Sequence, residues 1–154
     1  MQHRVGSPKW GERKDGCRRM YRITNVYVNN SVKEWISPSV LNNIFRKERI
    51  VYFENHPEVD ERCGVKGNLV ITETMGEFLK PCPCTTFYTG CGYTVLNYMH
   101  NCPLTCTYCI LQAYCNEPAV MLYANFGDLL DELEMKVWKP RRRLRIGTGE
   151  LGDS

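Results

Sequence analysis

Short apolar stretches recur along this chain, and they predict a series of β-strands. In the first stretch, β-branched and aromatic residues alternate with polar ones, which is the pattern of a half-buried strand. The stretch Thr94–Met99 fits a buried strand. The predicted strands are Tyr21–Val28, Ile50–Phe53, Leu69–Thr74, Thr94–Met99 and Ala119–Asn125, and a further short strand begins at Leu144.

Between these strands, the pattern favours helices. A helical stretch is predicted over Val32–Arg46, and Pro38 divides it because proline interrupts the hydrogen bonding of a helix. A short helix is predicted directly after Cys109 and ends at Asn116–Pro118. The longest helix is Phe126–Trp138, whose apolar residues at 126, 129, 130, 133 and 137 leave an acidic outer face. Strands and helices together predict an α/β fold.

Composition and length indicate how the chain is divided into regions and how many domains it can form. Residues 1–19 are polar, basic and rich in glycine, so we expect a flexible lead-in. Residues 20–79 contain strand, helix, strand and strand, which predicts a small α/β cap. With 154 residues, of which 43% are hydrophobic and 24% charged, there is room for one domain with a core. No apolar run approaches the length of a membrane helix, and a net charge of +3 is too small to indicate a partner.

Three cysteines follow the predicted strand Thr94–Met99, in the stretch NCPLTCTYC. Cys102, Cys106 and Cys109 are separated by three and then two residues, which is close enough for three thiolates to bind one small polynuclear centre. Thiolates are the usual ligands of iron–sulfur clusters. A four-iron cluster held by three cysteines leaves one iron for an outside ligand, and open metal positions are where chemistry takes place.

The chain contains nine cysteines, and this number narrows the alternatives. An odd number without a secretory signal argues against a disulfide framework and indicates a reducing, cytoplasmic compartment. A zinc site with Cys91 or Cys115 as fourth ligand remains open, as does a zinc-stabilised nucleic-acid-binding module that also uses Cys82 and Cys84. Otherwise, Cys82 and Cys84 belong to a proline-stiffened loop, and Cys115 packs as a small apolar residue.

A second stretch with chemical potential lies at the end of the sequence. A short apolar strand runs into Gly147, Thr148, Gly149 and Glu150. The two glycines allow the backbone to approach a ligand closely, and the glutamate supplies an acceptor for an ammonium group. The basic run before it, Lys139–Arg145, is either a contact for phosphates or a solvated edge.

Together, the run Lys80–Pro118 and the run Pro140–Ser154 resemble the spore photoproduct lyase family of radical S-adenosylmethionine proteins. The resemblance implies a four-iron four-sulfur cluster on the three cysteines, with S-adenosylmethionine on the free iron. It also implies that residues 80–154 begin a partial TIM-like barrel behind the α/β cap. In that family the aromatic residue of the triplet, here Tyr108, packs near the adenine, and the motif Gly147–Glu150 holds the amino group of the cofactor.

The same resemblance implies an activity and partners. Such proteins cleave S-adenosylmethionine to a 5'-deoxyadenosyl radical, and the lyases use it on a thymine dimer in DNA. A DNA lesion is therefore the expected substrate class, and a flavodoxin or ferredoxin the expected electron donor. The stretch GELGDS has Leu151 where the lyases carry a hydrogen-returning cysteine, which predicts another substrate. The sequence ends just after the second barrel strand, so we expect an amino-terminal fragment, and an inactive fragment is a further alternative.

Overall fold

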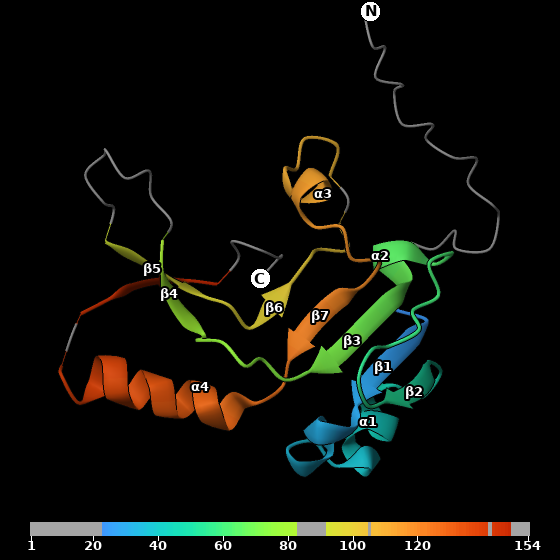
Figure 1. Ribbon diagram of the computed structural model, residues 1–154, viewed down its shortest axis with the longest axis horizontal. Coiled ribbons are helices and arrows are strands. Elements are labelled where there is room, and N and C mark those ends of the chain that lie inside the picture. The colour runs from blue at the N-terminus through green and yellow to red at the C-terminus, as the bar shows by residue number, and fades with distance from the viewer. Residues whose placement is uncertain (1–22, 83–91, 105, 142, 149–154) are drawn as a thin grey trace, which may run out of the picture.

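Two β-sheets with connecting helices make up the protein (Figure 1), seen in a computed structural model that describes residues 23–82, 92–104, 106–141 and 143–148. Within these residues, the larger sheet has the strand order β2–β1–β3–β7–β6 and the smaller sheet β4–β5–β8. The strands are β1 (Asn25–Asn29), β2 (Arg49–Phe53), β3 (Asn68–Thr72), β4 (Leu79–Pro81), β5 (Tyr93–Leu96), β6 (Met99–His100), β7 (Val120–Tyr123) and β8 (Arg145–Gly147). The helical elements are η1 (Asn30–Glu34), α1 (Pro38–Ile44), α2 (Gly64–Gly67), α3 (Leu111–Tyr114), α4 (Phe126–Leu133) and η2 (Glu134–Trp138).

The central strands of the larger sheet, β1 and β3, are parallel and buried on both faces. β1 pairs in parallel with β2 and with β3, and β3 pairs in parallel with β7. On one face, Val26 of β1 belongs to a buried cluster that includes Leu41 of α1. On the other face, Tyr27 packs with Val70 and Ala119. Burial on both faces is typical of parallel strands and explains why these stretches are nearly continuously apolar.

Most of the predicted elements are confirmed. Pro38 divides the predicted helical stretch, because η1 ends at Glu34 and α1 begins at Pro38, where the missing proline N–H costs no hydrogen bond. The predicted helix Phe126–Trp138 is present as α4 followed by a π-helical turn, η2. The short elements α2 and β4 were not predicted. No helix in the described residues is long and apolar enough to cross a membrane.

The strand predicted over Thr94–Met99 is in fact two strands that belong to different sheets. β5 pairs with β4 and β8, whereas β6 pairs antiparallel with β7 at the edge of the larger sheet. Between them, the N–H of Asn97 donates to the carbonyl of Phe78 at 2.8 Å, and the carbonyl of Tyr98 accepts from the N–H of Tyr123 at 2.9 Å. One continuous apolar run therefore serves both sheets.

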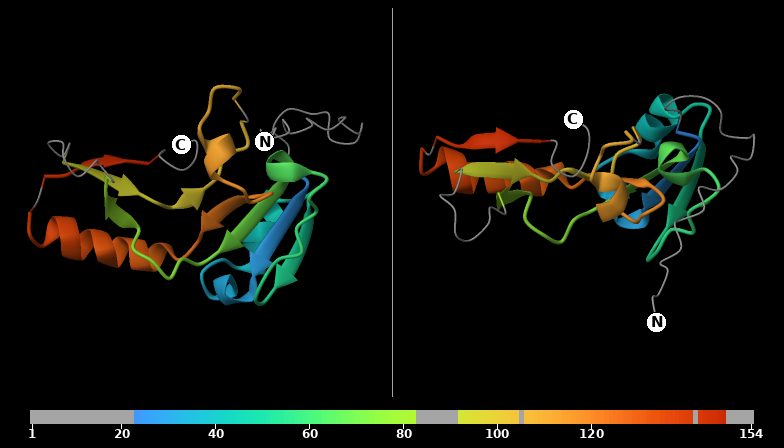
Figure 2. Two further views of the ribbon diagram at one scale, coloured as in Figure 1. Left: turned by 45° about the horizontal axis from the view of Figure 1, so that its top comes forward. Right: turned by 90° about the horizontal axis from the view of Figure 1, so that it is seen from above.

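Helix α4 is tied to the smaller sheet through a carboxylate. Glu132 accepts hydrogen bonds from the backbone N–H groups of Phe78 at 2.8 Å and Leu79 at 3.1 Å. The Nζ atom of Lys136 lies 2.6 Å from Glu132 and 3.0 Å from Glu77. Figure 2 shows α4 running alongside the smaller sheet. The acidic face of this helix was predicted to point outward, and Glu132 departs from that prediction because it supplies partners to the start of β4.

The side chain of Tyr93, on β5, lies close to a glycine of β8. In their parallel register, Val95 lies beside Gly147, and Tyr93 lies beside Arg145. A Cβ atom added to Gly147 would overlap the hydroxyl group and ring of Tyr93. Gly147 is therefore needed for the close contact that Tyr93 makes with the end of β8.

Glu132 should make the stability of the protein depend on pH. Burial alone would raise the pKa of Glu132, but its hydrogen bonds with Lys136 and with the N–H groups of Phe78 and Leu79 outweigh this and lower it below the ordinary value of 4.5. A lowered pKa in the folded state adds stability above the unfolded-state pKa, and this stability is lost as the pH falls through the folded-state pKa. We expect the free energy of unfolding, measured with urea, to fall as the pH drops below about 4.5.

The Glu132→Gln variant should lose part of this pH dependence and should be less stable at neutral pH. Glu134→Gln is the matched control, because Glu134 is exposed and pairs with Lys139 at the surface at 3.3 Å. We expect the control to keep the pH profile of the unsubstituted protein. If Glu132→Gln kept that profile too, the carboxylate would not be the group responsible.

Replacement of Gly147 by alanine should destabilise the protein, because the new methyl group overlaps Tyr93. Overpacking of this kind costs about 1–3 kcal/mol, measurable as a loss of unfolding free energy. Gly127→Ala in α4 is the control: its Cβ would meet no atom within 4 Å, and alanine favours helix by about 1 kcal/mol. A Tyr93→Ala change should offset the Gly147→Ala loss in the double variant. Equal stability of the two glycine variants would contradict the contact.

Candidate metal centre

The cysteine triplet lies on the loop that leads from β6 to β7 and projects from the larger sheet (Figure 1). The loop contains α3, which confirms the short helix predicted after Cys109. The N–H of Cys109 donates to the carbonyl of Cys106 at 3.0 Å, and the N–H of Gln112 donates to the carbonyl of Cys109 at 3.3 Å. The side-chain amide of Gln112 also donates to the Cys106 carbonyl. Two successive tight turns thus fold the second and third cysteines into one compact segment.

All three cysteines of the triplet line one cavity of about 210 Å³. Each of them is half-buried. The N–H of Leu104 donates to the Sγ atom of Cys102 at 3.4 Å. The other residues that line the cavity are Val65, Asn101, Leu111, Gln112 and Cys115.

The donor groups of this cavity suit a soft metal centre. Its potential ligands are thiols, and neither a histidine nor a carboxylate is among the described residues that line it. Thiolates select zinc, copper(I) and iron–sulfur clusters. In the described part of the chain, no three His, Cys, Asp or Glu side chains are grouped closely enough to hold a single metal ion.

Cys115 also lines the cavity and is buried. It is only 7% exposed. Burial raises the pKa of the Cys115 thiol, and the negative charge of Glu117 raises it further. The burial of this side chain agrees with its predicted role as a small packing residue. The zinc alternative also involved Cys82, which is half-buried, and Cys84 and Cys91, which lie outside the described residues.

The residues predicted to bind the cofactor are described only in part. The side chain of Tyr108, between the second and third cysteines, is 90% exposed. Gly147 ends β8 and Thr148 follows it. β8 runs with its carboxyl end toward the side of the molecule that carries the cysteine loop (Figures 1 and 2). Gly149 and Glu150 lie outside the described residues, so their roles stay predictions.

Asn101, directly before the first cysteine, is a site residue that the sequence analysis did not identify. It is only 4% exposed, and its φ angle is 73°. Its side chain hydrogen-bonds the backbone on both sides of the loop, at Cys102, Glu117 and Ala119. The sequence signal was its residue type, because asparagine tolerates positive φ and often bonds nearby backbone.

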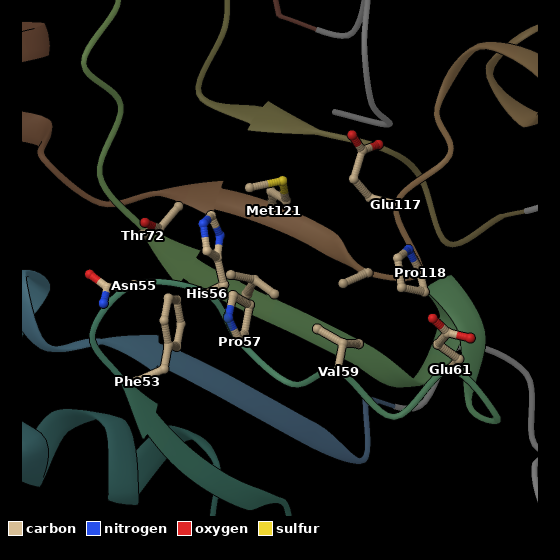
Figure 3. A pocket seen from close by; sticks show the side chains of 12 residues that line it. Phe53, Asn55, His56, Pro57, Val59, Glu61, Thr72, Glu117, Pro118 and Met121 are labelled. Atoms are coloured by element: carbon tan, nitrogen blue, oxygen red, sulfur yellow. The ribbon is translucent and has the colours of Figure 1, made fainter.

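A second cavity, of about 360 Å³, lies against the larger sheet (Figure 3). Val70 of β3 and Ala119, the residue before β7, contribute an apolar floor, and His56 and Glu117 contribute polar groups. Glu117 also pairs with His100, with 3.3 Å between Oε2 and Nε2. This cavity therefore adjoins the base of the cysteine loop, and the sequence analysis did not predict it.

Comparisons with known proteins give matches in structure but not in sequence. No protein-family model and no curated protein matches this chain significantly. A structure of spore photoproduct lyase complexed with dinucleoside spore photoproduct matches 88% of this chain, with a TM-score of 0.67 and 14% identity. A cysteine-to-alanine mutant of that enzyme with the same dinucleoside matches 88% at a TM-score of 0.65 and 15% identity. The mutant alone matches 88% at 0.66 and 14%.

These matches establish a similarity of fold and do not establish the chemistry of the site. An identity of 14% is too low to transfer a substrate or a catalytic residue, since one fold hosts many functions. The agreement covers the mixed α/β arrangement with its parallel sheet. This chain spans 42%, 41% and 42% of the three matched chains. The chain therefore shares the fold of spore photoproduct lyase over 88% of its own length.

Proposed function

We propose that this chain binds a four-iron four-sulfur cluster and acts in a radical S-adenosylmethionine enzyme related to spore photoproduct lyase. The observation that carries the proposal is the meeting of Cys102, Cys106 and Cys109 at one cavity of about 210 Å³. The shared fold supports the proposal independently of the cysteines. It rests on the path of the backbone over 88% of the chain and not on the identity of three residues.

In this proposal, each thiolate of the triplet binds one iron, and the fourth iron is left to the amino and carboxylate groups of S-adenosylmethionine. The hydrogen bond from the N–H of Leu104 to the sulfur of Cys102 helps to fix the position of this ligand. When bound, such a cluster would supply the one electron for reductive cleavage of S-adenosylmethionine to methionine and a 5'-deoxyadenosyl radical. The half-buried setting of the cysteines restricts the access of water to the centre.

Tyr108 and the end of β8 complete the cofactor site in this proposal. The exposed ring of Tyr108 is available to stack on the adenine, and Gly147–Glu150 hold the amino group. The contact between Gly147 and Tyr93 fixes the point from which that motif begins. The parallel pair β5–β8 would supply the first two strands of the predicted barrel over residues 80–154.

The radical would abstract hydrogen from a substrate of the DNA-lesion class. The matched lyase was solved with a dinucleoside spore photoproduct, which supports a nucleotide substrate here. Leu151, where the lyases carry a cysteine, favours a different member of that class. Arg141 and Arg143 are exposed and would contact phosphates. The same proposal includes a flavodoxin or ferredoxin as electron donor and a cytoplasmic location. It also includes a division of the chain into a lead-in (residues 1–19), an α/β cap (20–79) and the start of a barrel (80–154).

The Cys106→Ala variant should fail to assemble the cluster, because it removes one of the three protein ligands. After anaerobic reconstitution with iron and sulfide, we expect the unsubstituted protein to show broad visible absorbance and nearly equal amounts of iron and sulfide. The variant should lose both. Visible spectra and chemical analysis of iron, sulfide and zinc measure the result.

Cys63→Ala is the matched control, because Cys63 is also half-buried but does not line the cysteine cavity. We expect this control to keep the iron content and the spectrum of the unsubstituted protein. An unchanged spectrum in Cys106→Ala would overturn the assignment. One zinc per chain without sulfide would favour the nucleic-acid-binding module instead.

A further inference from the structure

Asn101 occupies the point where the chain leaves β6 and enters the cysteine loop. It adopts a φ of 73°, a left-handed conformation in which glycine and asparagine carry the least strain. It is only 4% exposed, although it is polar and lies at the start of a projecting loop. A buried polar side chain needs hydrogen-bond partners, and the partners of Asn101 indicate its structural role.

The side-chain amide of Asn101 joins the two ends of the loop. Its Nδ2 atom donates to the carbonyl of Glu117 at 2.8 Å and to the carbonyl of Ala119 at 3.1 Å. Its Oδ1 atom accepts from the N–H of Cys102 at 2.8 Å. Both N–H groups and the oxygen of the amide are therefore used. Aspartate lacks the donors, and glycine lacks the side chain.

These bonds attach the first cysteine to the core of the larger sheet. Ala119 is only 2% exposed and packs with Tyr27 and Val70, so its carbonyl is a rigid anchor. The N–H of Cys102 is held by Asn101, while the Sγ of Cys102 faces the N–H of Leu104. The orientation of Cys102 toward the cavity is thus set from both sides.

We propose that Asn101 is the positioning residue of the cysteine triplet. Its side-chain amide hydrogen-bonds to both ends of the loop and fixes the position of Cys102 before any cluster is bound. The part of this proposal that concerns the cluster rests on the proposed function. A cluster bound to a loop that is already closed loses iron slowly, because release of one ligand does not let the loop open.

The test compares Asn101→Gly and Asn101→Asp with a matched pair at Asn125. Glycine accepts a φ of 73° and removes only the side-chain bonds, and aspartate keeps the acceptor but replaces the donors. Asn125 lies just after the other end of β7, is 2% exposed, donates to Thr74 and Asp128, and accepts from the N–H of Thr74. Asn125→Gly therefore removes buried side-chain bonds away from the cysteines, and Asn125→Asp in addition places a carboxylate beside Asp128.

Two measurements are made on each protein. In the metal-free protein, the alkylation rate of Cys102 is compared with that of Cys63 in the same molecule by peptide mass spectrometry. In the reconstituted protein, the rate of iron loss to a chelator is followed by visible absorbance. We expect both Asn101 variants to raise the relative alkylation of Cys102 and the rate of iron loss by about ten-fold. We expect the Asn125 variants to change neither.

The outcomes separate this proposal from the proposed function. If the Asn101 variants behave like the unsubstituted protein, or if the Asn125 variants accelerate both rates equally, Asn101 is not a positioning residue. Should the unsubstituted protein take up no iron and sulfide, the proposed function fails. The alkylation rates of Cys102 would then decide whether Asn101 holds the loop. Thermal unfolding of all the variants identifies any variant that does not fold. If a glycine variant does not fold, the aspartate variant at the same position is used in its place.

Discussion

The parallel pairing of β7 with β3 is the interaction on which the site depends. It places Val120 beside Leu69 and Leu122 beside Ile71, in the middle of the larger sheet. Because β7 follows the cysteine loop directly, this pairing fixes the far end of the loop in the buried core. β6 then pairs with the outer edge of β7 and fixes the near end. The triplet is thus carried by a sheet whose strands come from both sides of it in the sequence.

This arrangement requires support at the base of the loop. His100 and Met121 are paired neighbours, yet the whole cysteine loop lies between them, whereas most hairpin connections have about 2–5 residues. β6 has only 2 residues, so its own hydrogen bonds hold the loop weakly. Asn101 adds three side-chain bonds at this point, each worth about 1 kcal/mol. The length of the loop and the shortness of β6 together explain why a buried asparagine stands there.

The sequence predicted the features that depend on neighbouring residues. The strands β1, β2, β3 and β7 follow from apolar runs, the division at Pro38 follows from proline chemistry, and the cysteine spacing marked the site. Partners that are distant in sequence decide the remaining features. The inward orientation of Glu132 depends on the N–H groups of Phe78 and Leu79, and no helical pattern contains them. The division of Thr94–Met99 between two sheets likewise depends on strands before and after it.

Buried asparagines mark the ends of the strands that carry the loop, and their chemistry explains the choice of residue. Asn68 begins β3 and donates to carbonyls of Asp60, Gly64 and Pro118, Asn101 lies at the start of the loop, and Asn125 follows β7. At a strand end, backbone carbonyls and N–H groups leave the ladder and need new partners. A carboxylate offers only acceptors and a hydroxyl only one donor, whereas a side-chain amide offers two donors and an acceptor. A loop held at its ends by such amides is anchored to the sheet independently of the residues at its tip.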